Sequence, residues 1–398
     1  MRSLSDGALA PLSLPTFRRL WLATAAAHTG YWAQSVAVAW WLVEQKHGPQ
    51  VVALAHVTSS LPVLLLSYAS GWLIDRFDYR RVQRLSQGWI LLTSVALLAL
   101  MCLDAPGPRA LLILTGLMGA GVALRNPAWQ AGIGQIVSLR HLSAAIVLSS
   151  VAFNLARTIG PLIAGLLISA WGIWCAFLYN TIATLVLFIA LQRPPTHQPV
   201  AIPRNTATLA PIDPSARRWL GRLCLRAIGV GLPTSALLAL LPVIASPEQH
   251  GPAAYVRLLG AFGGGGLVAA LIRPRLVKAL SPDHLLNICS GIFAICLLFV
   301  AWQPRGHLIA TVTTAGAMWL MLFSTLNVAV HHHSGASYRG RALAAYMTSA
   351  FGGMAAGGLL WGWLAEVSGW DSAMLAASAV LLCNLVFYRP RVCEVATD

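Results

Sequence analysis

Acidic side chains are scarce in this sequence, which holds twelve Asp and Glu against 27 Lys and Arg among its 398 residues. Charged residues of both signs make up 10% of the chain and hydrophobic residues 57%. A soluble globular domain carries about 25% charged residues. A water-exposed domain of the present composition would aggregate, and the solvent that suits it is a lipid bilayer. The low charge content therefore excludes an ordinary soluble domain.

Motifs of catalysis and metal binding are also missing. The sequence has no GxSxG, HExxH or phosphate-loop pattern, and none of its seven Cys forms a CxxC pair. His331, His332 and His333 would point in different directions on a helix, so they make a poor metal cage. The run GGGG at 263–266 lies in an apolar segment, where close helix packing explains it better than phosphate binding. We expect no enzyme activity, no cofactor and no metal.

Long apolar runs dominate the chain instead. About 20 apolar residues cross the roughly 30 Å of bilayer hydrocarbon. Twelve runs approach or exceed this length: 18–43, 50–74, 85–103, 108–128, 141–169, 172–191, 218–245, 252–277, 284–302, 307–330, 341–366 and 371–388. The sequence therefore predicts an all-α integral membrane protein with twelve transmembrane helices.

Basic residues concentrate in alternate gaps between these runs, which is the pattern of membrane topology. With both termini placed in the cytoplasm, 21 of the 27 Lys and Arg fall on the inner side, including Arg125 near the end of the fourth run and Arg140 after it. The outer side holds three: Lys46, Arg109 and Arg305. The net charge of +15 forms no basic face with interleaved aromatics, so nucleic acid is not an expected partner. We expect a multi-pass protein of a bacterial inner membrane with cytoplasmic N- and C-termini.

The chain divides into two halves. A Pro-rich hydrophilic stretch follows the sixth run and predicts an N-terminal bundle at 1–192, a cytoplasmic linker at 193–217 and a C-terminal bundle at 218–398. The segment GPLIAGLLISAWG at 160–172 aligns with GGLLWGWLAEVSG at 357–369. This match pairs the fifth run with the eleventh, as two pseudo-symmetric six-helix bundles require.

The stretch GWLIDRFDYRR at 71–81 lies between the second and third runs and resembles the loop signature of the major facilitator superfamily. The matching residues are Gly71, Leu73, Asp75, Arg76, Arg80 and Arg81. The usual second Gly of the signature is Asp78 or Tyr79 here. The resemblance implies that Asp75 faces the start of the eleventh span near Arg341 and acts as a cytoplasmic latch between the halves.

The stretches FRRLWLATAAAHTGYWAQSVAVAWWLV and NPAWQAGIGQIVSLRHLSAAIVLSSVAFNLARTIGPLIAG resemble the siderophore and macrolide efflux branch of that superfamily. In the second stretch Gly160, Pro161 and Gly165 are similar to an exporter signature of the fifth span. The resemblance implies efflux of a small molecule by alternating access, coupled to protons, by a monomer in the lipid bilayer.

Polar residues inside apolar runs mark candidate substrate contacts, because a polar group that faces lipid is costly. In the first run, His28, Tyr31 and Trp32 recur at helical spacing and share one face. The candidate substrate-binding residues are His28, Tyr31, Trp32, Gln34, His56, Asn154, Arg157, Arg226, Arg257 and Asn327.

Arg157 is the most informative of these residues, because an arginine at the centre of a membrane helix costs about 2.5–3.5 kcal/mol on insertion scales. It either binds an anionic group of the substrate or packs structurally against Asn154 and helix ends. Arg226 and Arg257 either contact substrate or snorkel toward the interface. A cationic, aromatic interior favours anionic cargo by charge complementarity.

No acid lies at mid-membrane in the predicted spans, so a proton-coupling carboxylate is not evident. Histidine titrates near physiological pH, which makes His28 the first coupling candidate and Glu44, at an outer end, the second. Alternatively, His28 is a neutral side chain hydrogen-bonded within the bundle.

Three functions remain open: a proton-driven exporter of a siderophore or similar anion, a broad drug or macrolide exporter, and a membrane scaffold or sensor that moves nothing. The buried basic residues weigh against a passive scaffold.

Overall fold

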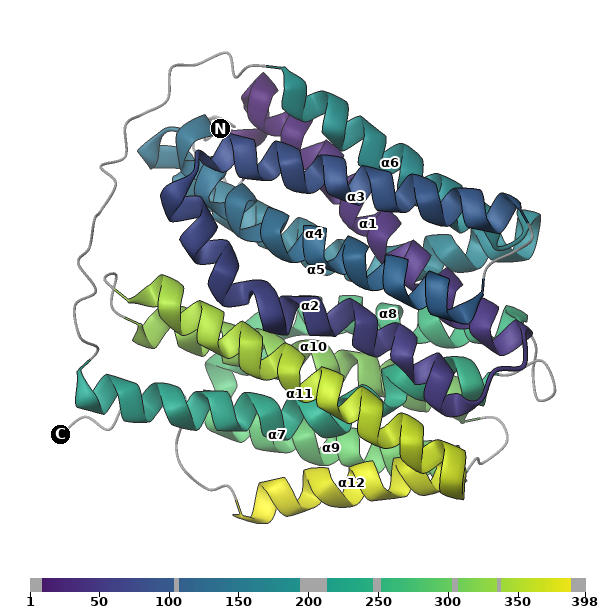
Figure 1. The fold of residues 1–398 in the computed structure, drawn as a ribbon. Coiled ribbons are helices and arrows are strands. Elements are labelled where there is room, and N and C mark those ends of the chain that lie inside the picture. Colours follow the sequence, from purple (N-terminus) through teal and green to yellow (C-terminus); the bar gives the residue numbers. More distant parts are fainter. Residues whose placement is uncertain are drawn as a thin grey trace. The chain divides into compact units, whose positions relative to one another are not determined.

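The computed structural model describes residues 9–103, 107–193, 213–245, 252–302, 307–334 and 338–387. Within these ranges the chain forms twelve α-helices, a short 3-10 turn at Ala10–Ser13 and no β-strand (Figure 1). The helices are α1 Pro15–Glu44, α2 Pro49–Arg76, α3 Tyr79–Cys102, α4 Pro108–Ile136, α5 Leu139–Trp171, α6 Trp174–Gln192, α7 Pro214–Ile244, α8 Pro252–Ala279, α9 Pro282–Trp302, α10 Leu308–His333, α11 Arg339–Ser368 and α12 Trp370–Phe387.

Each predicted apolar run corresponds to one of these helices. Among the described residues, α2 to α11 each contain a segment that is long and apolar enough to cross a membrane. The segment Trp370–Leu385 of α12 is apolar but shorter, and α1 has 30 residues. Many large apolar side chains, such as Leu166 and Leu271, are exposed on the outer surfaces of the helices. The predicted all-α membrane fold is confirmed.

Local sequence signals set many helix ends. Proline is the first residue of α1, α2, α4, α7, α8 and α9, where its missing N–H is not needed. Asp78 caps α3, since its Oδ1 accepts a hydrogen bond from the Arg80 N–H at 3.4 Å. This role explains why an Asp can stand where the family signature has a Gly. Asp213 caps α7 similarly, and hydrogen bonds from Ser215 lower the pKa of the Asp213 carboxyl.

One helix is longer than expected. The sequence predicts that the fourth run ends at 128, but α4 continues through Pro127 to Ile136. Membrane helices tolerate internal proline because neighbouring groups satisfy the freed backbone. Arg125 therefore lies inside α4, where only 2% of its surface is exposed. Counting Arg125 among the cytoplasmic charges was wrong.

The chain forms two compact units, and each is described by itself. The first unit contains α1 up to Ala37, α2 from Leu65, and α3 to α6. In this unit α3 packs against α4 on one side and α6 on another (Figure 1). Phe17, Trp129 and Ile133 lie in its largest described apolar cluster, which joins α1 to α4.

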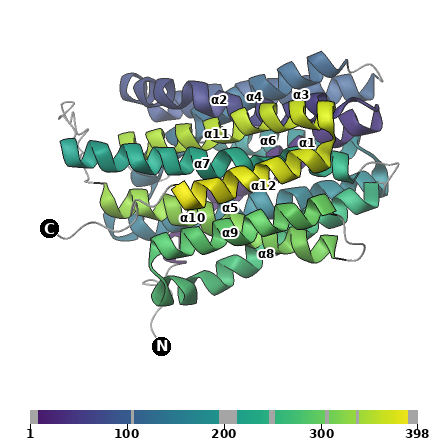
Figure 2. The ribbon, with the colours of Figure 1, turned by 90° about the horizontal axis from the view of Figure 1, so that it is seen from below.

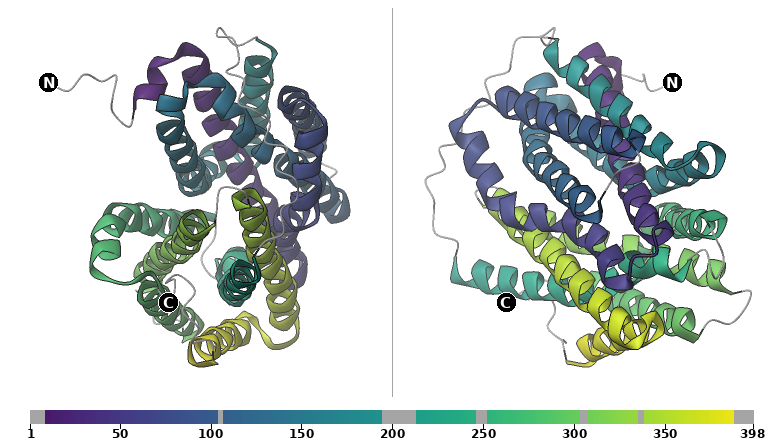
Figure 3. Two further views of the ribbon diagram at one scale, coloured as in Figure 1. Left: turned by 90° about the vertical axis from the view of Figure 1, so that its left-hand side faces the viewer. Right: turned by 45° about the vertical axis from the view of Figure 1, so that its right-hand side comes forward.

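The second unit contains the end of α1 from Val38, the start of α2 up to Leu64, and α7 to α12. Within it α7 lies alongside α11, as Figure 2 shows. Helix α10 packs against α8 and α9, and α9 against α12; the two views of Figure 3 show this group from other sides. The domain boundaries expected at 192 and 218 stay a prediction based on the linker.

The internal repeat is visible in matching helix ends and contacts. Gly172 ends α5 with a φ of 95°, and Gly369 ends α11 with a φ of 90°, a backbone region that favours glycine. A Cβ on Gly160 of α5 would lie 2.6 Å from the Cβ of Trp32 on α1. The equivalent Gly357 of α11 packs on the Leu232 carbonyl of α7. The fifth and eleventh helices thus pack on the first helix of their own halves.

The four-glycine run at 263–266 lies in α8, as expected for a packing feature. Gly265 lies against the Thr313 carbonyl of α10, and Gly316 of α10 lies against the Phe262 carbonyl of α8. Neither position has room for a Cβ. The predicted role of this run in close helix packing is confirmed at Gly265.

Candidate functional site

A buried arginine joins three helices of the first unit. Arg125 of α4 donates from Nη1 to Oε1 of Gln87 on α3 at 2.9 Å, and its Nη2 lies 3.3 Å from Nδ1 of His28 on α1. Gln87 in turn donates from Nε2 to the Thr184 carbonyl of α6 at 2.9 Å. A guanidinium has only donors, so Nδ1 of His28 must be the acceptor. His28 is therefore a neutral imidazole in this arrangement, with its proton on Nε2.

Aromatic rings connect His28, Gln87 and Arg125 to Arg157, another arginine of the same unit. The ring of Phe153 on α5 meets that of His28 edge to face, with centroids 5.1 Å apart. The Cζ atom of Arg157, one turn further along α5, lies 5.5 Å from the Phe153 centroid and 4.9 Å from the Trp32 centroid. Trp32 also contacts Tyr31 edge to face at 5.8 Å. We call His28, Trp32, Arg125, Phe153 and Arg157 the arginine–aromatic cluster.

Acidic residues are scarce in the helices that form the cluster. The sequence contains no Asp or Glu between Asp6 and Glu44, between Asp78 and Asp104, or between Asp104 and Asp213. These stretches include all of α3 to α6 and nearly all of α1. Cation–π contacts and neutral hydrogen-bond acceptors hold the guanidinium groups instead. The cluster is thus a fixed positive region that complements an anion.

Close helix packing positions the cluster. Gly160 lets α5 approach α1, because a Cβ there would come within 2.6 Å of Trp32 and 2.8 Å of the Thr29 carbonyl. This contact is about one turn from Arg157 along α5 and brings the backbone of α5 close to Trp32, whose ring contacts the Arg157 guanidinium. The exporter-like Gly160 is therefore part of the support of the site. Pro161 and Gly165, from the same signature, are buried in α5.

Gln34 belongs to a second polar network, deeper in the first unit. Its Oε1 accepts from Nδ2 of Asn180 at 2.7 Å, and the same Asn180 nitrogen donates to Ser94 Oγ at 3.0 Å. Gln34 has no exposed surface and Asn180 only 1%. Gly30 allows this approach, since a Cβ there would lie 2.8 Å from Oδ1 of Asn180. The network ties α1, α3 and α6 together and satisfies its own polar groups.

Four further substrate candidates belong to the second unit, and one lies outside the described side chains. In the second unit, Arg226 of α7 donates to Oδ1 of Asn384 at 2.9 Å and to Oδ1 of Asn287 at 2.5 Å. Arg257 of α8 is exposed, whereas His56 of α2 and Asn327 of α10 are partly buried. The side chain of Asn154 lies outside the described part. The structure brings together His28, Tyr31, Trp32 and Arg157 from the predicted set.

The proton candidate Glu44 is exposed at the end of α1. Its Oε1 accepts from Nε1 of Trp40 at 3.2 Å, and the Trp40 ring stacks on Tyr255 of α8 at 5.2 Å between centroids. These contacts belong to the second unit. Glu44 is thus an exposed residue of an aromatic cluster at a helix end.

The signature loop is described in part. The side chains of Gly71 and Asp75 lie outside the described residues, so the latch of Asp75 on Arg341 stays a prediction; Arg341 itself is partly buried in α11. Arg76 is exposed at the end of α2. Arg80 donates from Nε to the Tyr79 hydroxyl at 2.9 Å, whereas Arg81 is exposed.

A carboxylate contact of the same general kind does occur at the opposite end of α2. Glu366, near the end of α11, accepts at Oε2 from the backbone N–H of Gln50 at 3.2 Å. Gly48, just before α2, has no room for a Cβ because the Glu366 carboxylate occupies that space. Both partners belong to the second unit. A negative charge at a helix N-terminus is stabilising, so Glu366 holds the first turn of α2.

Sequence reasoning missed three members of the site. Arg125 was counted as a cytoplasmic charge because it lies three residues before the predicted end of the fourth run. Gln87 lies in the predicted third run, where a buried amide is a signal of an internal partner. Phe153 has no distinguishing signal, except that it lies one helical turn before Arg157 on the same face.

Comparisons with known proteins agree with this fold. A family model described as "Transmembrane secretion effector" matches residues 6–398. The Staphyloferrin A transporter of Staphylococcus aureus (strain NCTC 8325 / PS 47) is 23% identical over 372 residues, which are 90% of this chain and 92% of that protein. The crystal structure of the nucleoside transporter NupG matches with a TM-score of 0.72 at 13% identity, over 94% of this chain and 98% of that one. A POT family transporter in complex with 5-aminolevulinic acid matches with a TM-score of 0.73 at 13% identity, over 96% and 97%. At these identities the solved structures show the fold alone.

Proposed function

Since the chain belongs to the transmembrane secretion effector family of major facilitator transporters, we propose that it exports a siderophore or a similar carboxylate-bearing small molecule. Export would proceed by alternating access across a bacterial inner membrane, with both termini in the cytoplasm. The excess of basic residues in alternate gaps supports this orientation.

The observation that carries the proposal is the guanidinium of Arg157 between Trp32 and Phe153. The two rings contact the guanidinium through cation–π interactions, and the sequence places no Asp or Glu in α3 to α6. A carboxylate on a substrate can accept paired hydrogen bonds from such a planar group. A hydrogen bond to a charged group contributes about 1.5–3 kcal/mol, which corresponds to roughly a 10- to 150-fold effect on affinity.

The relative named as a Staphyloferrin A transporter supports the siderophore class, because its match extends over nearly the whole of both chains. That name describes the relative, and at 23% identity the cargo of the present chain is a proposal. The cationic character of the arginine–aromatic cluster independently favours an anion over a cationic drug.

We propose His28 as the coupling residue for protons, with Glu44 as the alternative. The observed hydrogen bond from Arg125 fits a neutral His28. A second positive charge on the imidazole would be repelled by the adjacent guanidinium, so proton uptake by His28 requires these two side chains to separate. Proton binding and the position of Arg125 would then be linked.

The test is transport by purified protein in proteoliposomes, with a radiolabelled citrate-type carboxylate siderophore as cargo. Arg157→Gln should raise the half-saturation concentration about 10- to 100-fold while membrane insertion stays normal. Arg157→Lys should give a smaller rise, since it keeps the charge but loses the planar contact. The matched control is Arg109→Gln, which removes an exposed arginine of α4.

Equal half-saturation in Arg157→Gln and Arg109→Gln would contradict an anion site at Arg157. Transport of lipophilic cations or uncharged macrolides, with no transport of carboxylates, would instead identify a drug exporter.

The variant His28→Gln tests proton coupling, because its side chain keeps an acceptor for Arg125 but cannot titrate. It should abolish the dependence of transport on an imposed pH difference, whereas an unchanged dependence would direct attention to Glu44.

A further inference from the structure

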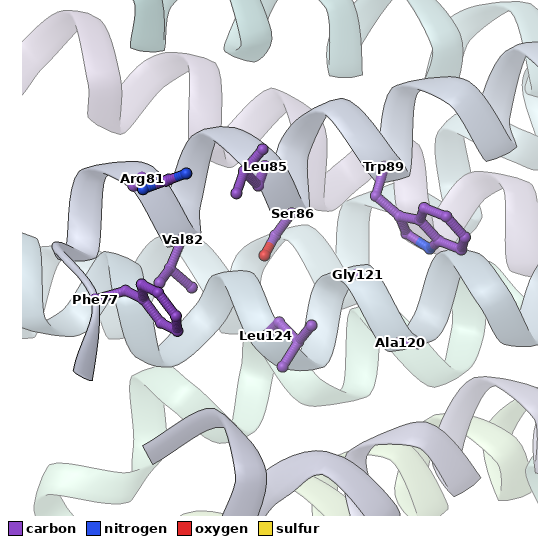
Figure 4. A pocket seen from close by; sticks show the side chains of 9 residues that line it. All are labelled: Phe77, Arg81, Val82, Leu85, Ser86, Trp89, Ala120, Gly121 and Leu124. Carbon is purple, nitrogen blue, oxygen red and sulfur yellow. The ribbon is translucent and has the colours of Figure 1, made fainter. Parts of the chain in front are cut away.

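A hollow lies between α3 and α4 of the first unit, and none of the residues of the arginine–aromatic cluster lines it. Its volume is about 560 Å³. Figure 4 shows the side chains around it: Phe77, Arg81, Val82, Leu85, Ser86, Trp89, Ala120, Gly121 and Leu124. Apart from the Arg81 guanidinium and the Ser86 hydroxyl, these side chains are apolar. The hollow is therefore an apolar groove with a cation at one end.

Residue spacing on the two helices creates the groove. Arg81, Leu85 and Trp89 follow one another at intervals of four along α3 and line one side (Figure 4). The facing stretch of α4 offers the small residues Ala120 and Gly121. A Cβ on Gly121 would lie 2.6 Å from Ile90 and 3.0 Å from Trp89, so α4 approaches α3 closely here.

Trp89 forms a fixed end of the groove. Its Nε1 donates to the Leu117 carbonyl of α4 at 2.8 Å, which holds the indole across the two helices. From Arg81 to Trp89 the helix rises about 12 Å, at 1.5 Å per residue. A flexible hydrocarbon chain of this length fits between the two ends.

The groove is open to the lipid. Leu85 is 66% exposed, Trp89 43% and Phe77 39%, although all three are large and apolar. Both α3 and α4 are long and apolar enough to cross a membrane. Water does not fill apolar grooves at this depth, so acyl chains of the bilayer are the available occupants.

Arg81 differs from the arginines beside it. Arg80 is engaged by the Tyr79 hydroxyl and ring, and Nε of Arg84 donates to the Arg80 carbonyl at 3.4 Å. In the described part of the chain, the guanidinium of Arg81 has no hydrogen bond or ion pair. It lies in the first turn of α3, at the level expected for phospholipid head groups, and on the side rich in Lys and Arg.

We propose that this groove is a binding site for one anionic phospholipid. The phosphate accepts hydrogen bonds from Arg81, and one acyl chain lies along Leu85 and Leu124 and ends at Trp89. Arginine matches phosphate with paired donors, and anionic lipids are enriched on the cytoplasmic side, where the basic bias places this end of α3. The site is independent of the proposed cargo and of the arginine–aromatic cluster.

Native mass spectrometry of delipidated protein, titrated with phosphatidylglycerol or phosphatidylcholine, tests the head-group contact. Phosphatidylglycerol should give one tightly bound lipid, and Arg81→Ala should weaken it about tenfold. Arg84→Ala is the matched control, since it removes an exposed arginine of the same helix, and should change the affinity less than twofold. Equal losses in the two variants, or equal binding of the two lipids, would overturn the proposal.

Tryptophan fluorescence tests the acyl-chain contact. Phosphatidylglycerol with brominated acyl chains should quench the wild-type protein more than Trp89→Phe, and the difference should disappear in Leu124→Trp, whose larger side chain fills the groove. Unchanged quenching in Trp89→Phe would place the chain elsewhere. A stable dimer in lipid-free detergent with Trp89 shielded from a soluble quencher would show that a second copy covers the groove.

Discussion

The contact between Glu366 and the start of α2 makes a quantitative prediction. Oε2 of Glu366 accepts from the Gln50 N–H, and Gly48 leaves room for the carboxylate. The substitution Glu366→Gln keeps the size of the side chain and removes its charge. Any change in the stability of the first turn of α2 then reports the interaction of that charge with the helix N-terminus.

The size of the effect follows from exposure. Glu366 is exposed, and a carboxylate at an exposed helix N-terminus contributes about 0.3–1 kcal/mol. Removing the charge should therefore shift the equilibrium between the held and released first turn about twofold to fivefold toward release.

Hydrogen exchange of the protein in lipid nanodiscs measures this shift directly. The amides of Gln50 to Val52 should exchange about two to five times faster in Glu366→Gln, because exchange follows the open population. The control is Asp371→Asn, which removes a neighbouring carboxylate that lies in the first turn of α12 instead. Equal acceleration in both variants, or none in Glu366→Gln, would refute the charge–helix argument.

Two further predictions concern packing and the buried cation. Gly160→Ala should destabilise the protein by about 1–3 kcal/mol, because the new Cβ meets Trp32 and a backbone oxygen. Gly88→Ala is the control and should not destabilise it, since the nearest atom to a Cβ there is 3.4 Å away. Thermal unfolding in detergent compares the two variants. Arg125→Met should destabilise by about 1–3 kcal/mol for each acceptor that loses its donor. Adding Gln87→Leu should recover part of this loss, and a double variant less stable than Arg125→Met would contradict the proposed pairing.

The sequence was informative wherever a local rule decides the outcome. Apolar runs of sufficient length predicted twelve helices, and the aligned segments at 160–172 and 357–369 paired the fifth run with the eleventh. Proline at helix starts is another local signal. The end of α4 was missed because the apolar run was ended at 128, whereas the helix continues through Gln130, Gly132 and Gln135 to Ile136.

The site was less predictable, because its partners come from four helices. His28 and Trp32 stood out as polar and aromatic residues on one face, and Arg157 as a cation in an apolar run. The pairing of Arg125 with His28 and Gln87 depends on how α1, α3 and α4 pack, which no local pattern encodes. Phe153 looked like an ordinary core residue and is instead the ring that links two of the polar side chains.

The absence of acids from α3 to α6 has an energetic consequence for the proposed transport. If the fixed charges of the site are only positive, the empty transporter returns to its starting state without carrying negative charge back into the cell. An anion that leaves the cell then moves with the inside-negative membrane voltage, which contributes about 2.3 kcal/mol per charge for each 100 mV. For a divalent anion this is about 4.6 kcal/mol, or roughly a thousandfold concentration ratio. The charge of the cargo would itself supply a driving force, and export should rise with voltage even without a pH difference.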